Sequence, residues 1–153
     1  MFARDLMDTR FHTLRPHQSI GEAVRMFHRA SEEEGKRIFG LMVTDDEDHL
    51  VGMLSMYDIL VFVQPKHVHL WGEVEEFEPD SAFDAMLERV KSIQVGDLMT
   101  TEVVTVKPDT HFIVIADLRI KRHIRRLPVA DGGNVVGIVY VSDVFHRLFK
   151  KFV

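Results

Sequence analysis

The sequence contains no cysteine, which excludes disulfide bonds, thiolate nucleophiles and cysteine-ligated zinc and is typical of a reducing compartment. It also lacks any apolar run near the roughly 20 residues that a membrane-spanning helix requires. Its first residues, MFARDLMDTRF, lack the apolar core of a signal peptide. These absences favour a cytoplasmic globular protein.

Positive charge and catalytic motifs are also scarce. The chain has 19 Lys and Arg against 24 Asp and Glu, and the net charge of -5 gives no global field that would attract nucleic acid or an acidic membrane. The basic run 119–126 has no interleaved aromatic residues for base stacking, so we interpret it as a solvated helix face with phosphate ligands. The chain contains neither a phosphate-binding P-loop motif nor a Gly-x-Ser-x-Gly elbow, so we expect binding and no enzymatic activity.

An internal repeat organises the chain. Asp5-Leu6-Met7 followed by Thr13-Leu14-Arg15-Pro16 returns as Asp97-Leu98-Met99 followed by Thr105-Val106-Lys107-Pro108. Further along, Val51-Gly52-Met53-Leu54 returns as Val136-Gly137-Ile138-Val139. Acidic or glycine-rich turns between two apolar runs predict a hairpin in each copy, and each copy therefore predicts the order β-α-β-β-α.

Helix-start signals follow the proline of each copy. Ser19 with Glu22 predicts a capping box for a helix whose apolar side carries Ile20, Ala23, Val24 and Phe27. In the second copy, Asp109 or Thr110 is the predicted cap of a helix whose apolar side carries Ile113, Ala116 and Ile120.

The ordered set of motifs, present twice, resembles the CBS domain, and two copies in one chain resemble the pair called a Bateman module. The resemblance implies an α+β fold of two β-α-β-β-α repeats, packed through their sheets with pseudo-two-fold symmetry. We expect repeat 1 over residues 1–60, a long connector over 61–94 and repeat 2 over 95–153.

The connector departs from the usual short linker. Phe83, Met86, Leu87 and Val90 recur at helical spacing and predict an extra amphipathic helix over about 81–92. His67 and His69 lie near carboxylates, but residues two apart face different sides of a helix, so we expect no metal site. The acidic run of Glu73, Glu75, Glu76, Glu78 and Asp80 is interpreted as a solvated loop.

Ser55-Met56-Tyr57-Asp58 follows a predicted buried strand and opens a predicted helix. The hydroxyl and free N–H groups there suit an anion, and a carboxylate three residues later suits ribose hydroxyls. The same spacing is also a plain helix cap, and the residues alone leave both interpretations open.

The resemblance implies that this segment binds the ribose and phosphate of an adenosine compound. Carried over residue by residue, it gives a first cavity with its basic contacts at the arginines: Ser55, Tyr57, Asp58, Thr100, Val104, Ile124, Arg125 and Arg126. It also gives a second, altered cavity: Asp8, His12, Ile38, Phe39, Tyr140, Ser142 and Asp143. Tyr140 stands there in place of a small hydroxyl residue, and Phe39 in place of an arginine.

The resemblance implies a stand-alone regulatory sensor that binds AMP, ADP or ATP between the repeats and forms a homodimer. No cofactor is expected beyond this regulatory ligand. The alternatives are an S-adenosylmethionine binder, or a ligand-free scaffold that binds an unidentified protein target. We expect neither a membrane nor a nucleic-acid partner.

Overall fold

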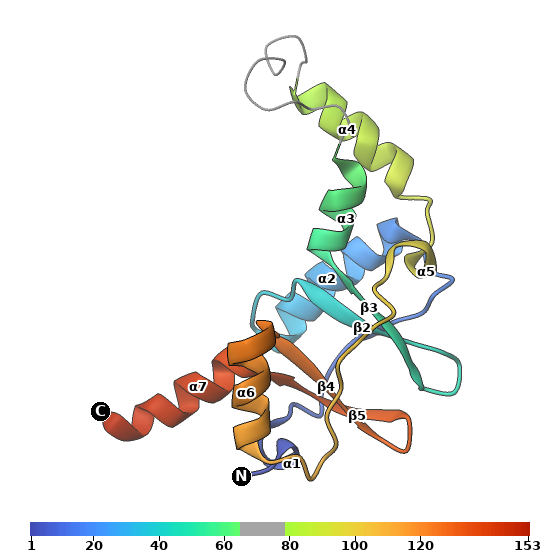
Figure 1. The fold of residues 1–153 in the computed structure, drawn as a ribbon. Coiled ribbons are helices and arrows are strands. Elements are labelled where there is room, and N and C mark those ends of the chain that lie inside the picture. The colour runs from blue at the N-terminus through green and yellow to red at the C-terminus, as the bar shows by residue number, and fades with distance from the viewer. Residues whose placement is uncertain (65–78) are drawn as a thin grey trace. The chain divides into compact units, whose positions relative to one another are not determined.

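The computed structural model describes the backbone of residues 1–64 and 79–153 and the side chains of residues 1–64 and 84–153. The chain forms two compact units, which are considered separately (Figure 1). Unit one comprises residues 1–11, 46–50 and 102–153, and unit two comprises 12–45 and 51–101. No helix in the described part of the chain is long and apolar enough to cross a membrane.

Unit two is built on a three-stranded sheet of order β1-β2-β3 in which β1 runs parallel to β2, with Thr13 opposite Met42. Its elements in chain order are β1 (Thr13–Leu14), α2 (Ile20–Glu34), β2 (Gly40–Thr44), β3 (Leu50–Ser55), α3 (Met56–Val63), α4 (Pro79–Val90) and α5 (Val95–Leu98). The first five give the predicted order β-α-β-β-α for the first repeat, which confirms that prediction.

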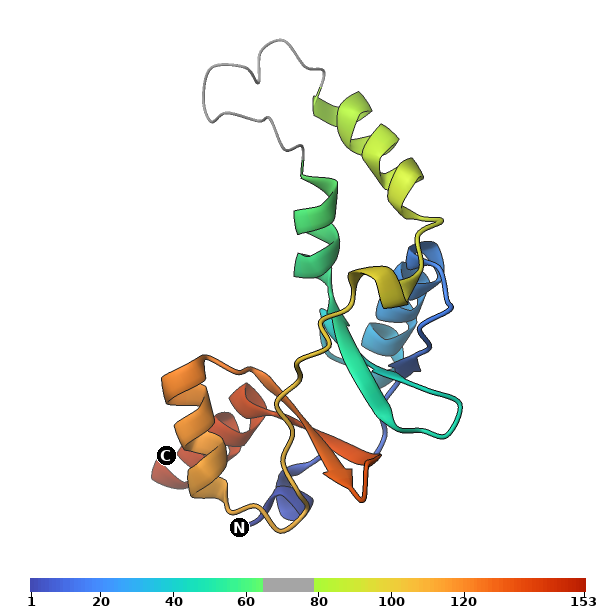
Figure 2. The ribbon, with the colours of Figure 1, turned by 45° about the vertical axis from the view of Figure 1, so that its right-hand side comes forward.

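Unit one is built on the antiparallel hairpin of β4 and β5, with Leu127 opposite Val139. Its elements are α1 (Ala3–Leu6), α6 (Phe112–Arg122), β4 (Arg126–Asp131), β5 (Asn134–Tyr140), α7 (Val141–Phe149) and the short 3-10 helix η2 (Lys150–Phe152). The predicted first strand of this repeat is reduced to one parallel bridge, Val106 to Val129. Figure 2 shows α6 and α7 side by side against the hairpin.

Helix α2 forms where its sequence predicts, with the Ser19 half of the predicted capping box but no hydrogen bond from the Ser19 N–H to the Glu22 side chain. Ser19 is the N-cap, and its hydroxyl accepts a hydrogen bond from the Glu22 N–H. Gly35 ends the helix in the left-handed conformation, with φ of 68°, which glycine adopts without steric cost. The buried residues recur at helical spacing and cover the sheet side: Ile20, Ala23, Phe27 and Ala30.

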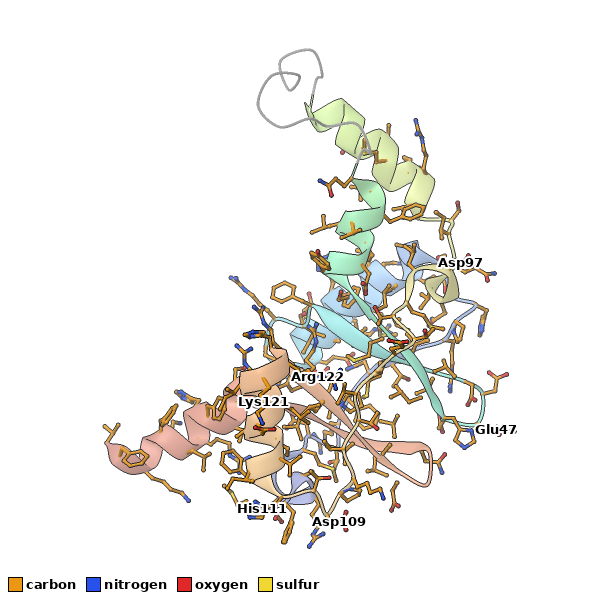
Figure 3. The ribbon with its side chains drawn as sticks, in the orientation of Figure 1. Glu47, Asp97, Asp109, His111, Lys121 and Arg122 are labelled. Carbon is orange, nitrogen blue, oxygen red and sulfur yellow. The ribbon has the colours of Figure 1, made fainter. Side chains whose placement is uncertain are left out.

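Helix α6 differs from its prediction in both cap and face. The N-cap is His111, labelled in Figure 3, whose Nδ1 accepts from the Ile113 N–H at 3.1 Å. Thr110 instead accepts from the Lys107 N–H, and Asp109 is exposed. Ile115 is the buried side chain, whereas the predicted core residues Ile113 and Ile120 are 68% and 71% exposed. The predicted cap and apolar side were wrong because this helix has apolar residues on more than one side.

The connector helix is confirmed, with bounds two residues earlier than predicted, as α4. Val90 is buried, Met86 is half-buried and Leu87 is 37% exposed. The predictions for His67, His69, Phe83 and the acidic residues Glu73, Glu75, Glu76 and Glu78 concern side chains outside the described residues. Asp80, predicted to lie in a solvated loop, is instead in the first turn of α4.

Each repeat gives its leading segment to the other repeat's hairpin. The Asp97-Leu98-Met99 segment is followed directly by Thr100. Thr100 forms two backbone hydrogen bonds with Met53 on β3, of 2.9 and 2.8 Å. The Asp5-Leu6-Met7 segment is followed directly by Asp8, which forms two backbone hydrogen bonds with Ile138 on β5, of 2.8 and 3.1 Å. Helix α5 therefore belongs to unit two and α1 to unit one.

A glycine permits each of these close approaches. A Cβ on Gly52 would lie 2.7 Å from Met99 Sδ and 2.9 Å from the Thr100 carbonyl oxygen. A Cβ on Gly137 would lie 2.6 Å from Met7 Sδ and 3.0 Å from the Asp8 oxygen. A methionine side chain can move, but the carbonyl belongs to a paired backbone and cannot move without breaking that pairing.

We expect Gly52→Ala to destabilise the protein by about 1–3 kcal/mol, because the added methyl overpacks the backbone pairing. Denaturant unfolding measures the change. Gly21→Ala is the matched control: its nearest contact is the Lys91 carbonyl oxygen at 3.4 Å, and alanine favours the α2 helix by up to about 1 kcal/mol. Equal stability of the Gly52→Ala variant and the wild type would contradict the close approach.

Candidate functional site

Ser55 and Asp58 form a reciprocal capping box at the start of α3. The Asp58 N–H donates to Ser55 Oγ at 3.2 Å, and the Ser55 N–H donates to Asp58 Oδ2 at 2.9 Å. The Ser55 hydroxyl also donates to that Oδ2, at 3.0 Å. The helix-cap interpretation of Ser-x-x-Asp is therefore confirmed, and one oxygen of Asp58 is used by the fold.

The other oxygen of Asp58 is only weakly engaged. Thr100, placed on the sheet by its pairing with Met53, brings its hydroxyl to 3.5 Å from Asp58 Oδ1, which is at the limit of a hydrogen bond. Tyr57, on the same turn, is 73% exposed. Hydrogen bonds in unit two therefore bring together Ser55, Asp58 and Thr100, and Tyr57 lies on the same turn. Asp58 Oδ1 can still accept hydrogen bonds.

The remaining predicted residues of the first cavity lie in unit one. Arg125 is exposed and directly precedes β4, where Arg126 lies opposite Tyr140. Val104 and Ile124 are half-buried against the core of that unit. That core is formed by side chains from α1, α6, α7, the hairpin and Val106: Ala3, Leu6, Val106, Ile115, Leu127, Val129, Val139, Val141 and Val144.

The residue before each hairpin occupies the same position in both units. The Arg125 carbonyl accepts from the Val141 N–H at 3.0 Å and so holds the start of α7. The Phe39 carbonyl accepts from the Met56 N–H at 2.8 Å and holds the start of α3 in the same way. Equivalent backbone positions thus carry a guanidinium in one unit and a phenyl ring, 52% exposed, in the other.

Tyr140 makes the start of α7 chemically different from that of α3. It is the N-cap, but its side chain forms no capping hydrogen bond. Ser142 and Asp143 are exposed on the first turn. Asp8 lies in the same unit, paired with Ile138, whereas the other predicted residues of the second cavity, His12, Ile38 and Phe39, belong to unit two.

His12 sits between two carboxylates that sequence reasoning missed. Its Nδ1 lies 3.0 Å from Glu34 Oε2, and its Nε2 lies 2.5 Å from Glu33 Oε2. Because both ring nitrogens face carboxylate oxygens, both must donate, and the imidazolium form satisfies this geometry. Burial lowers the pKa of His12, but the hydrogen bonds and charges of Glu34 and Glu33 outweigh burial and raise it above 6.5.

This ionic cluster also offsets an unfavourable helix end. Glu33 and Glu34 lie in the last turn of α2, where the helix dipole disfavours negative charge and no basic residue of the helix is present. Arg29 Nε lies 3.9 Å from Glu33 Oε1. The run of three glutamates before Gly35 was the sequence signal for such a cluster. Among the described residues, no group of three or more His, Asp or Glu has a geometry that could hold a metal ion.

The described geometry is that of a protein made of two related repeats, one with the order β-α-β-β-α and one in which the first strand is a single bridge. The chain belongs to the CBS domain family, which matches residues 3–64 and 95–150. The resemblance inferred from the repeated motifs is thereby confirmed, as is the α+β fold with two such repeats.

Known proteins with the same architecture cover nearly the whole chain. The chain is 28% identical over 140 residues to the chloroplastic CBS domain-containing protein CBSX2 of Arabidopsis thaliana, covering 87% of this chain and 56% of that protein. It is 30% identical over 145 residues to the uncharacterized protein MJ1426 of Methanocaldococcus jannaschii, covering 83% and 79%. A crystal structure of CBSX2 in complex with AMP superposes with a TM-score of 0.70 and 26% identity, covering 99% and 98%.

We expect the His12 cluster to make stability depend on pH. A histidine whose pKa is raised on folding adds stability below its unfolded pKa of about 6.5, and this contribution is lost as pH rises through the folded value. The free energy of unfolding of the wild type should therefore exceed that of His12→Gln by about 1 kcal/mol near pH 6, since Glu33 is largely exposed, and the difference should shrink by pH 8.

Urea unfolding across this pH range makes the measurement. His28→Gln, an exposed position on the same helix, is the control and should show no such trend. A His12→Gln difference that does not change with pH would show that the ring contributes by packing and not by charge.

Proposed function

We propose that this chain is a regulatory module that binds an adenine nucleotide, with the ribose hydroxyls donating to Asp58 Oδ1 beside the Thr100 hydroxyl. The observation that carries the proposal is that the two carboxylate oxygens of Asp58 have different hydrogen bonds. One oxygen closes the capping box, and the other has only a 3.5 Å contact, so it can accept from a ribose hydroxyl without dismantling the helix cap. Relatives add support, since CBSX2 has been crystallised with AMP.

The phosphate of the ligand is assigned to Arg125 and Arg126. A guanidinium suits phosphate because it combines charge with a forked set of donors. Tyr57, which is largely exposed, and the apolar Val104 and Ile124 are proposed to contact the base. With Phe39 in the position that Arg125 holds in unit one, and with Tyr140 in place of a small hydroxyl residue, the second set of residues is proposed not to bind phosphate: Asp8, His12, Ile38, Phe39, Tyr140, Ser142 and Asp143.

Binding is proposed to act by changing association or shape, with no reaction catalysed. A homodimer is proposed because apolar side chains are exposed on helices of both units. Ile113 and Ile120 of α6 are 68% and 71% exposed, and Leu60, Val61 and Phe62 of α3 are each more than half exposed. The same faces support the alternative function, a scaffold that binds a protein partner without any small ligand.

We expect thermal unfolding of the wild type to shift upward with one of AMP, ADP, ATP or S-adenosylmethionine. A ligand at about 100 times its dissociation constant adds about 2.7 kcal/mol, which for a chain of this size corresponds to about 5–10 °C. Asp58→Asn should abolish the shift, because one amide oxygen keeps the cap while the NH₂ group replaces the acceptor that the ribose requires.

Asp109→Asn is the matched control, since Asp109 is an exposed carboxylate (Figure 3) that is not among the proposed site residues, and it should keep the full shift. Asp58→Ala is less informative because it also removes the cap and costs about 1 kcal/mol without any ligand. No shift with any of the four compounds would reject the nucleotide function and favour the scaffold.

We expect Ile113→Asp/Ile120→Asp to convert a wild-type dimer into a monomer, because burying two carboxylates in an apolar contact is strongly unfavourable. Size-exclusion chromatography with light scattering measures the molecular mass. Thr101→Asp/Thr105→Asp adds the same charge at exposed polar positions and should remain dimeric. A monomeric wild type, or an aspartate variant that is still dimeric, would reject this interface.

A further inference from the structure

The negative net charge, on which the expectation of no membrane partner was based, is an average over unequal parts of the chain. Residues 118–130 and 144–153 hold eight of the 19 Lys and Arg residues and none of the 24 Asp and Glu residues. These segments form the end of α6, the start of the hairpin and most of α7 with η2, all in unit one. The rest of the chain is correspondingly acidic.

The end of α7 combines this charge with exposed aromatic side chains. The ring of Phe145 meets that of Phe112 edge-on, with 6.4 Å between the ring centroids, and stacks on that of Phe149 at a centroid distance of 6.2 Å. The centroids of Phe149 and Phe152 lie 6.4 Å apart. Exposure increases along this series, from the half-buried Phe145 to 61% for Phe149 and 86% for Phe152. In Figure 1 this end of α7 extends beyond α6 and the hairpin.

Three cations lie between these rings in the sequence. Arg147, Lys150 and Lys151 are exposed, and none forms an ion pair with any residue in the described part of the chain. On α6, Lys121, labelled in Figure 3, pairs with Asp117 at 3.0 Å and is therefore already compensated. We define the basic-aromatic tip as Phe149 and Phe152 with Arg147, Lys150 and Lys151.

Charge decides which partner fits the tip. A two-fold contact centred on the tip would place it against the same tip of a second copy, and its three cations would then face three more. An anionic lipid surface instead supplies negative headgroups for the cations and an apolar layer beneath for the rings. It also makes no demand on shape, so two exposed rings at a helix end are sufficient for contact.

We propose that the basic-aromatic tip binds the surface of an anionic lipid membrane. Phe149 and Phe152 insert at the boundary between headgroups and acyl chains, and the long lysine side chains reach the phosphates around them. One short helix end with three cations gives weak, reversible attachment and does not span the bilayer. A membrane can thus concentrate the module at its surface without any change in the proposed nucleotide site.

Vesicle co-sedimentation of the 153-residue chain tests this proposal. Binding is expected to vesicles of mixed phosphatidylserine and phosphatidylcholine and not to phosphatidylcholine alone. It should weaken strongly between about 0.1 M and about 1 M salt, as the screening length falls from about 10 to about 3 Å. Lys150→Glu/Lys151→Glu should weaken binding by about 30-fold or more, given roughly 1 kcal/mol for each cation at the surface.

Two further variants separate charge from insertion. Phe149→Ser/Phe152→Ser should also lose binding, whereas Arg10→Glu/Lys107→Glu, which makes the same charge change at exposed positions outside the tip, should keep most of it. Circular dichroism and thermal unfolding check that each variant folds. Equal binding to neutral vesicles, or an equal loss in the Arg10/Lys107 variant, would overturn the proposal.

The other possible occupants give different results in the same variants. If Phe149→Ser/Phe152→Ser makes a dimeric protein monomeric, a second copy covers the tip and the membrane proposal is wrong. If the chain binds a single-stranded oligonucleotide in a way that depends on both phenylalanines while anionic vesicles do not bind it, the partner is nucleic acid and the proposal is likewise wrong.

Discussion

The backbone pairing between each leading segment and a strand glycine is the constraint on which the rest of the structure depends. Gly52 and Gly137 lack the Cβ that would collide with the incoming carbonyl, so Thr100 can pair with Met53 and Asp8 with Ile138. Through these pairings, α5 joins the sheet of unit two and α1 joins the hairpin of unit one. Thr100 reaches Asp58 for the same reason, so the contact between these two side chains at the start of α3 follows from this pairing.

The two units share this framework but differ in the groups at their helix starts. Ser55 and Asp58 complete a reciprocal cap on α3, whereas Tyr140 leaves α7 without a side-chain cap. At equivalent backbone positions, Arg125 places a cation in one unit and Phe39 an apolar ring in the other. The shared hydrogen bonds preserve the fold, while the side chains that no backbone pairing constrains have diverged.

Local sequence patterns predicted the element order of the first repeat, both hairpins, the Ser19 cap of α2 and the connector helix, because each depends on residues close in sequence. The face of α6 was predicted wrongly, since apolar residues surround that helix and only its packing selects Ile115 over Ile113 and Ile120. The His111 cap was missed because histidine is an uncommon cap. The exchanged leading segments and the carboxylates around His12 depend on contacts between distant parts of the chain, which local patterns do not report.

The geometry of Asp58 is compatible with both its structural role in the cap and the binding role proposed for it. A carboxylate has two oxygens, and the cap uses Oδ2 for both hydrogen bonds from Ser55. The cap thereby fixes the orientation of Oδ1, so the proposed binding of a ribose hydroxyl there would cost little side-chain entropy. A plain cap and a ribose acceptor were alternatives at the level of sequence, but the geometry makes them compatible: the first role positions the atom that the second requires.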